Sequence, residues 1–297
     1  MAKLGDYVKI RTGKLDANAS SESGQYPFFT CAIEPLKIDS YSYDCECVLV
    51  AGNGDLNVKY YSGKFDAYQR TYIIESMDKT FLDVQYLYFF MDKYLETLRS
   101  QSIGGVIKYI KLGNLTEADI FIPSIERQRE IVRILRKSRE LVSLRKQQIA
   151  KLDELVKARF VEMFGDVLLN SMQWPEKTLE RMADIVSGIT KGRKTAETDL
   201  QEVPYMAVSN VKDGYIDWTT VKTILATRQE IEQYRLMPDD ILMTEGGDPD
   251  KVGRGAIIRV PLKNSIHQNH IFRVRLNEQE ILPSYFAEYL RHQKAKR

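Results

Sequence analysis

The sequence contains few of the residues that build disulfide or metal sites. Only three of the 297 residues are cysteine and only three are histidine. Cys45 and Cys47 flank a single glutamate and no C-x-x-C motif occurs, so we expect reduced, structural thiols. His267 and His270 lie three residues apart, but no Cys, Asp or Glu completes the spacing of a zinc set. We therefore expect no metal and no cofactor.

Long apolar runs are also missing. No window approaches 18 consecutive apolar residues, and the densest stretch, residues 81–91, is interrupted by Asp83 and Gln85. Residues 1–6 lack the apolar segment of a signal peptide. With 43% hydrophobic and 28% charged residues, the composition is that of an ordinary globular protein. These features predict a cytoplasmic protein without a membrane partner.

The motifs of several enzyme classes are absent. There is no G-x-x-x-x-G-K-[ST] loop, no G-x-S-x-G and no Pro-Pro pair of the kind found in adenine methyltransferases. A nuclease pattern could begin at Pro238-Asp239 and end at Lys251, but Pro249 occupies the position of the metal-binding acid. The sequence therefore predicts a protein without catalytic residues.

The chain contains an internal repeat. Five segments recur in the same order, with offsets that drift only from 175 to 200 residues. The matched pairs are residues 3–13 with 179–188, 26–29 with 203–206, 48–55 with 241–248, 67–74 with 267–274 and 82–90 with 282–290. Each copy shows short strands separated by Gly, Pro and Asp turns and followed by a helix. We expect two similar mixed domains around a curved sheet, with two unrelated mixed domains as the alternative.

A long helix is expected between the copies, over residues 123–164, where neither Gly nor Pro follows Pro123. Apolar residues recur there every seven positions, which is the pattern of a coiled coil. They are Leu135, Val142, Ile149, Val156 and Met163. The segment carries 11 basic and 6 acidic residues and, at 1.5 Å per residue, would extend about 60 Å. Its apolar stripe needs a partner helix.

The predicted fold is therefore α+β, with two similar domains joined by a long coiled-coil helix. The expected boundaries are 1–122 for the first domain, 123–164 for the helix and 165–297 for the second domain. Because Arg297 aligns near Thr97, we expect the second copy to stop before a helix of its own. Such a chain would be truncated, or its helix would pair in trans.

Several segments together resemble the DNA-specificity subunit of type I restriction–modification systems. They are residues 3–6, the 52–55 turn, residues 122–131, residues 152–166 and Trp174-Pro175. Residues 122–131 are similar to the family's Pro-Pro-x-x-Glu-Gln motif, with Ser124 and Arg127 as departures. The resemblance implies two target-recognition domains that each read half of a split site in double-stranded DNA. It also implies helices that dock methyltransferase subunits and, through them, restriction subunits.

Candidate DNA-contacting residues lie in the loops, where forked donors and amides could read bases and lysines could bind phosphates. We select Asn53, Gln69, Arg70, Lys108, Lys191, Arg193, Lys194, Lys251, Arg254, His267, Gln268 and Asn269. Lys191, Arg193 and Lys194 are expected to contact phosphates, whereas the segments around 69 and 268 occupy equivalent places in the repeat. Each segment is also compatible with an ordinary turn or a solvated loop.

Two alternatives stay open. A non-catalytic coiled-coil scaffold would keep the helix but would need no base-reading loops. A half-subunit would bind DNA only after its helix pairs with a second chain.

Overall fold

The computed structural model describes residues 2–167, 169–193, 198–246 and 252–291. It divides into two compact units, Met1–Lys146 and Gln147–Arg297, which we call the first and the second unit. The division falls inside the long helix α3 (Ile125–Phe164), whereas the sequence treats residues 123–164 as a separate segment. Each unit is described by itself.

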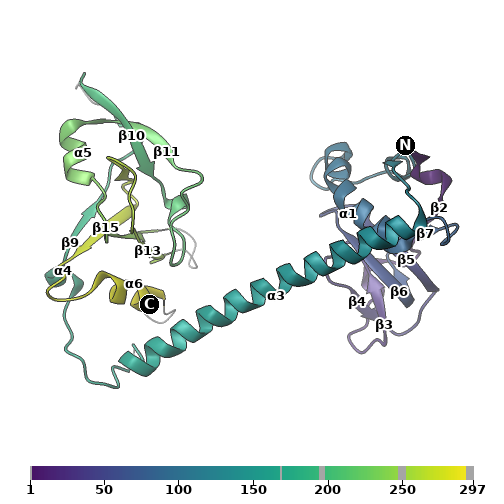
Figure 1. The fold of residues 1–297 in the computed structure, drawn as a ribbon, viewed down its shortest axis with the longest axis horizontal. Helices are drawn as coiled ribbons and strands as arrows, with labels where there is room; N and C mark the ends of the chain where they lie inside the picture. Colours follow the sequence, from purple (N-terminus) through teal and green to yellow (C-terminus); the bar gives the residue numbers. More distant parts are fainter. Residues whose placement is uncertain (1, 168, 194–197, 247–251, 292–297) are drawn as a thin grey trace. The chain divides into compact units, whose positions relative to one another are not determined.

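The first unit is built on a six-stranded sheet with the strand order β2-β7-β5-β6-β3-β4 (Figure 1). A further pair, β1 with β8, is antiparallel. The strands are β1 (Ala2–Lys3), β2 (Val8–Thr12), β3 (Tyr26–Phe29), β4 (Leu36–Ile38), β5 (Tyr43–Ala51), β6 (Val58–Ala67), β7 (Thr71–Ser76) and β8 (Asp119–Ile120). The helical segments are η1 (Leu4–Asp6), η2 (Ala17–Ala19), α1 (Val84–Gln101) and α2 (Leu112–Thr116).

Helix α1 covers one face of this sheet and forms the main core with it. Its buried residues Leu87, Met91 and Leu98 pack in one cluster with Val48 and Ile74 of the central strands. Asp83 caps the helix, because its carboxylate accepts hydrogen bonds from the amides of residues 85 and 86 at 2.8 and 3.0 Å.

A buried glutamine ties α3 to the first unit. The Gln128 side chain is fully buried. Its Oε1 accepts from the Asp83 amide at 2.9 Å, and its Nε2 donates to the carbonyls of Phe81 and Pro123 at 2.8 Å each. One side chain thus joins the start of α1 to the start of α3. This is the glutamine of the 122–131 motif, so the motif has a structural role here.

We expect Gln128→Met to lower the free energy of unfolding by about 2 kcal/mol, because the thioether fills the space but leaves three part-buried backbone groups without their partner. Urea denaturation followed by circular dichroism measures the loss. Gln147→Met is the matched control, since Gln147 is exposed on the same helix. Equal stability of the two variants would contradict the proposed role of Gln128.

The second unit contains two sheets, with the orders β13-β12-β15-β9 and β11-β10-β14. Figure 1 labels most of these strands. Its strands are β9 (Ala183–Ser187), β10 (Leu200–Met206), β11 (Lys222–Thr227), β12 (Ile241–Thr244), β13 (Gly255–Ile257), β14 (Ile266–His267) and β15 (Ile271–Leu276). The helical segments are α4 (Leu179–Met182), η3 (Val208–Asn210), α5 (Arg228–Tyr234) and α6 (Pro283–Arg291).

Strand pairing follows the same plan in both units. The antiparallel set β2-β7-β5-β6 corresponds to β9-β15-β12-β13. The parallel pairing of β3 with the end of β6 corresponds to that of β10 with β14. Where the first unit has the single strand β6, the second has β13 and β14, separated by a segment that contains Pro261 and a left-handed turn at Asn264. Proline removes a ladder donor, so the strand is interrupted there.

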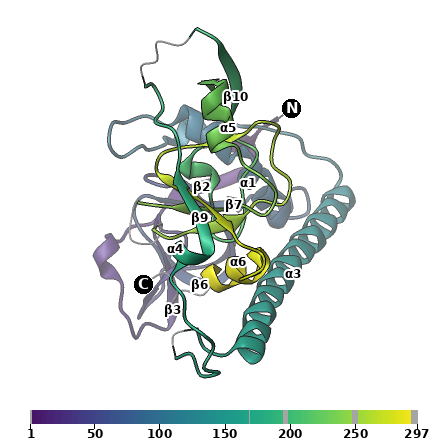
Figure 2. The same cartoon turned by 90° about the vertical axis from the view of Figure 1, so that its left-hand side faces the viewer.

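Helix α3 is continuous over 40 residues, which confirms the long helix expected from the heptad pattern. Its first part packs on the first unit, where the Arg139 guanidinium lies 2.6 Å from Asp92 and 4.5 Å from the Phe89 ring centroid. Its last part lies beside α6, where the Phe160 and Tyr285 rings stack at 5.4 Å (Figures 1 and 2). No described helix is apolar enough over a sufficient length to cross a membrane.

Candidate nucleic-acid interface

One turn is held in the same way in both units, by main-chain atoms. In the first unit the amides of Tyr68 and Gln69 donate to Phe29 and Leu15 at 3.0 and 2.9 Å, and the Gly52 amide donates to Arg70 at 2.8 Å. In the second unit the equivalent bonds run from Gln268 to Met206, from Asn269 to Ile189 and from Glu245 to His270, at 3.0, 3.0 and 3.1 Å. We call residues 68–70 and 268–270 the clamped turns.

Each clamped turn is approached closely by a glycine. A Cβ atom on Gly13 would lie 2.1 Å from the Ala67 carbonyl oxygen, and one on Gly188 would lie 2.0 Å from that of His267. Both distances are far below van der Waals contact, so only glycine fits. The correspondence between Ala67 and His267 is the one that the sequence repeat predicts.

The first unit brings together candidate residues from three separate segments. The Gly54 amide donates to the Lys108 carbonyl at 2.9 Å, and Asn53 pairs with Tyr109 in a β-bridge. Through Gly52, the same turn is bonded to Arg70. Asn53, Gln69, Arg70 and Lys108 therefore lie along one edge of the unit.

This edge is exposed and carries more positive than negative charge. Gln69, Arg70 and Lys108 are exposed, and Asn53 is half-buried. Neither Arg70 nor Lys108 has an ion pair among the residues that the structure describes. The nearby Asp55 carboxylate faces Arg99 at 3.9 Å. Two cations and two amide-bearing side chains are thus available for an anionic partner.

His267 does not lie at the surface, which corrects its assignment as a base reader. Its side chain is fully buried, with Nδ1 3.3 Å from the Tyr234 carbonyl oxygen and Nε2 3.1 Å from that of Val186. Burial lowers the pKa of the imidazole, so the ring is kept neutral. A neutral imidazole can donate to only one of these two carbonyl oxygens. The buried ring belongs to the core beneath the clamped turn.

The three side chains of the second clamped turn differ in exposure and in hydrogen-bond partners. Gln268 is half-buried, and its Oε1 accepts from the Val208 amide at 3.2 Å. Asn269 is also half-buried, with Nδ2 3.4 Å from Nε2 of His270. His270 is exposed, with Nδ1 3.2 Å from Glu245, and occupies the place of Arg70. The internal repeat also aligns His270 with Arg70.

The basic residues of the loop after β9 have different surroundings. Lys191 is exposed next to Gly192, whose φ is +75°. Arg193 is half-buried, and its Nε donates to Glu230 at 2.6 Å, while Nη2 also bonds this carboxylate. The guanidinium holds the pKa of Glu230 below its usual value. Arg193 thus stabilises the start of α5. Lys194 lies outside the described residues.

The remaining basic candidates are Lys251 and Arg254, and the structure describes only the second of them. Lys251 lies outside the described residues. Arg254 is half-buried beside β13, and its carbonyl accepts from the Thr244 amide at 2.9 Å. The structure therefore fixes the backbone of Arg254 at the sheet edge.

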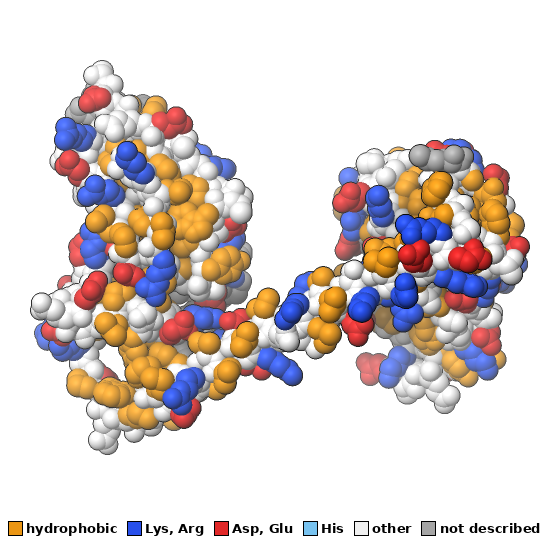
Figure 3. Space-filling model, viewed as in Figure 1, with side chains coloured by type: hydrophobic (Ala, Val, Ile, Leu, Met, Phe, Trp, Pro, Cys, Tyr) orange, Lys and Arg blue, Asp and Glu red, His pale blue; other side chains and the backbone are white. Residues whose placement is uncertain are grey.

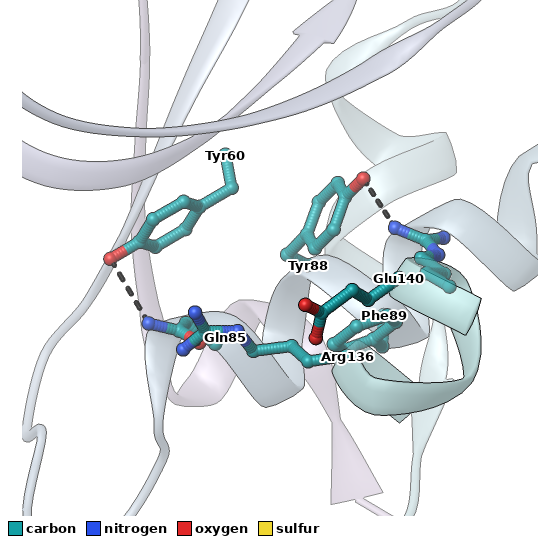
Figure 4. A pocket seen from close by; sticks show the side chains of 7 residues that line it. Tyr60, Gln85, Tyr88, Phe89, Arg136 and Glu140 are labelled. Carbon is teal, nitrogen blue, oxygen red and sulfur yellow. Dashed lines mark hydrogen bonds between the residues drawn. The ribbon is translucent and has the colours of Figure 1, made fainter. Parts of the chain in front are cut away.

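A separate hollow of about 490 Å³ lies between β6, α1 and the first part of α3. Figure 4 shows Gln85 directed toward the Tyr60 hydroxyl, with Phe89, Arg136 and Glu140 around the hollow. Its polar groups are held by one another, for example Arg139 by the Tyr88 hydroxyl at 2.6 Å. In the described ranges no three His, Cys, Asp or Glu residues gather as a metal site.

The apolar stripe of α3 is exposed, and Figure 3 shows hydrophobic side chains along the helix. All five heptad residues are between 38% and 62% exposed. In chain order, Leu135, Val142, Ile149, Val156 and Met163 are exposed by 38%, 55%, 62%, 43% and 50%. Helix α1 lies beside Leu135 and Val142 at the start of the stripe and leaves both of them partly exposed.

Comparison with known proteins gives a consistent result. The family model described as the type I restriction modification DNA specificity domain matches residues 1–154, just over half of the chain. The EcoDI specificity subunit of Escherichia coli is 37% identical over 155 residues, which are 52% of this chain and 34% of that protein. The MjaVIII specificity subunit of Methanocaldococcus jannaschii is 23% identical over 244 residues, which are 74% of this chain and 57% of that protein.

Two solved structures share the fold. The S subunit of a type I restriction–modification system from M. genitalium has a TM-score of 0.59 and 17% identity, covering 98% of this chain and 76% of that one. A second chain comes from a structural study of complex assembly and conformational transition in a type I restriction–modification system. It has a TM-score of 0.54 and 14% identity, and the match covers 99% of this chain and 80% of that one. The α+β fold with a long helix is thereby confirmed. The matched part of this chain spans about a third of the length of the EcoDI subunit and just over half of the length of the MjaVIII subunit.

Proposed function

Because this chain belongs to the type I restriction–modification DNA specificity family, we propose that it reads a bipartite site in double-stranded DNA, one half with each unit. The supporting observation is the pair of clamped turns. Equivalent main-chain bonds present Gln69 and Arg70 in one unit and Asn269 and His270 in the other. The chain contributes recognition and assembly, and the chemistry belongs to its partners.

The proposed contacts form two sets. In the first unit, the cations Arg70 and Lys108 bind phosphates or guanine while Asn53 and Gln69 offer amides to base edges. In the second unit, Asn269 and His270 take the reading positions, with Gln268 partly committed to Val208. Lys191, Lys194, Lys251 and Arg254 are proposed as further phosphate contacts. Arg193 and His267 are left out, because the one is paired with Glu230 and the other is buried.

The partners are proposed to dock on α3. Its exposed apolar stripe fits a helix of comparable length, supplied by a second chain or by a methyltransferase subunit. Restriction subunits would be reached through the methyltransferase. A pure scaffold would use the same stripe, but it would have no need of two polar turns held by equivalent main-chain bonds.

Neutralising Lys191 and Lys194 together (Lys191→Gln, Lys194→Gln) should weaken DNA binding similarly for all sequences. The slope of log K against log[salt] should fall by roughly one unit per lost phosphate contact. Fluorescence anisotropy with a labelled duplex at several salt concentrations measures the slope. An altered sequence preference with an unchanged slope would mean that these lysines read bases.

Arg193→Gln is the matched control. We expect this variant to lose thermal stability, since Glu230 loses its partner, and to keep the wild-type salt slope. The same titrations test the proposed function. The wild-type chain, alone or co-purified with its methyltransferase, should bind duplex DNA, and absence of binding in both preparations would overturn the proposal.

A further inference from the structure

The segment between α1 and α2 forms a closed turn, which we call the tip loop (residues 103–109). The amides of Ile103 and Tyr109 donate to each other's carbonyls at 3.0 and 2.8 Å. Gly104 has a φ of +117°, and a Cβ atom there would lie 2.5 Å from the Ile107 carbonyl oxygen. The loop thus has a defined conformation that depends on glycine.

The tip loop is fixed to the edge that carries the proposed DNA contacts. The Gly54 amide bonds to Lys108 at 2.9 Å, and the Ile110 amide bonds to Gly52 at 2.9 Å. Since Gly52 also bonds to Arg70, the loop and the first clamped turn share one anchor. The loop therefore holds its position relative to Asn53 and Arg70.

The end of this loop is apolar and uncovered. Val106 is 104% exposed and Ile107 is 63% exposed. No described residue packs over them. Lys108 follows immediately and is exposed as well. Two adjacent apolar side chains on a rigid, glycine-dependent turn, with cations beside them, suit a partner that combines an anionic surface with an apolar interior.

We propose that Val106 and Ile107 form a wedge that inserts between adjacent base pairs from the minor groove. Minor-groove proteins combine apolar wedges with Arg, Lys, Asn and Gln side chains, and the same combination occurs here in Arg70, Lys108 and Asn53. Phosphates on either side would hold the cations while the wedge unstacks one base step and bends the duplex. This inference rests on the proposed function, because it requires that the first unit bind DNA.

The test uses the full chain and a duplex that the wild-type chain selects from a random-sequence library. The fluorescent base 2-aminopurine replaces one base at a time, and its emission rises when stacking is lost. We expect a rise at a single step on binding. In Val106→Ser/Ile107→Ser the rise should disappear and the affinity should fall about tenfold, because apolar burial is lost. The salt slope should stay unchanged, since no charge is altered.

Met77→Ser is the matched control. Met77 is 63% exposed and follows β7, whose first residue adjoins Arg70. The six residues of β7 place it about 20 Å away, at the other end of the strand. This variant should behave as wild type. Thermal denaturation should show equal stability for all variants, because the substituted side chains are exposed.

The outcomes separate the two proposals. If the wild-type chain binds no DNA, either alone or co-purified with its methyltransferase, the proposed function fails and the wedge fails with it. If the wild type binds without a fluorescence rise, or if the double variant keeps the rise, DNA binding stands and the wedge is overturned. Loss of affinity without any fluorescence rise would indicate a groove contact, such as one to a thymine methyl group, and would also overturn insertion.

Discussion

Exchanging residues 166–297 for the matching part of another protein of this family is expected to change one half of the recognised DNA site completely and to leave the other half unchanged. Each unit has its own buried clusters and its own clamped turn, held by main-chain bonds within that unit. The exchange therefore replaces the proposed base readers of one unit without disturbing those of the other. Mapping methylated sites in cells that supply the partner methyltransferase gives the result.

A smaller change provides the control for this exchange. His270→Ala should relax specificity only in the half-site that the exchange alters, because His270 lies in the second unit. If the exchange alters both halves together, the two units read DNA as one joint surface, and the assignment of one half-site to each unit is wrong.

Replacing Ile149 by Asp is expected to abolish assembly through α3. Ile149 is 62% exposed, so the folded chain tolerates the charge. In a packed helix–helix seam the same carboxylate would be buried without a partner, at a cost of several kcal/mol, or a loss of affinity of more than about 100-fold. Sedimentation velocity of the chain alone and with the methyltransferase measures the loss.

Gln147→Asp introduces the same charge two residues away, at a position outside the heptad stripe. This variant should assemble like the wild type. Association of Ile149→Asp at wild-type strength would show that the stripe is not an assembly surface.

The sequence was most informative where a regular pattern repeats. Seven-residue spacing predicted the helix over 123–164, and the structure has it over Ile125–Phe164, because a long apolar stripe without Gly or Pro has few other conformations. The aligned segments 67–74 and 267–274 also share their hydrogen bonds. Main-chain hydrogen bonds depend on the spacing of strands and turns along the chain, and the internal repeat preserves that spacing.

Side-chain partners were much harder to predict. Arg193 pairs with Glu230, 37 residues away, and no local pattern announces that contact. The burial of His267 did have a signal, since the aligned residue Ala67 is small and apolar, as expected for a position that faces inward. Within the tip loop the sequence pointed only to Lys108, because the chain has no second copy of this loop for alignment. The role of Gln128 required three distant backbone groups to be seen together.

The clamped turns are held by main-chain bonds, so their conformation does not depend on which side chains they carry. Phe29, Leu15 and Gly52 bond to backbone atoms of residues 68–70, and the side chains of Gln69 and Arg70 take no part in those bonds. Point mutations at these exposed positions therefore cost little stability. Such positions can therefore vary while the turn persists. If these side chains read bases as proposed, a change of DNA specificity requires no change of fold.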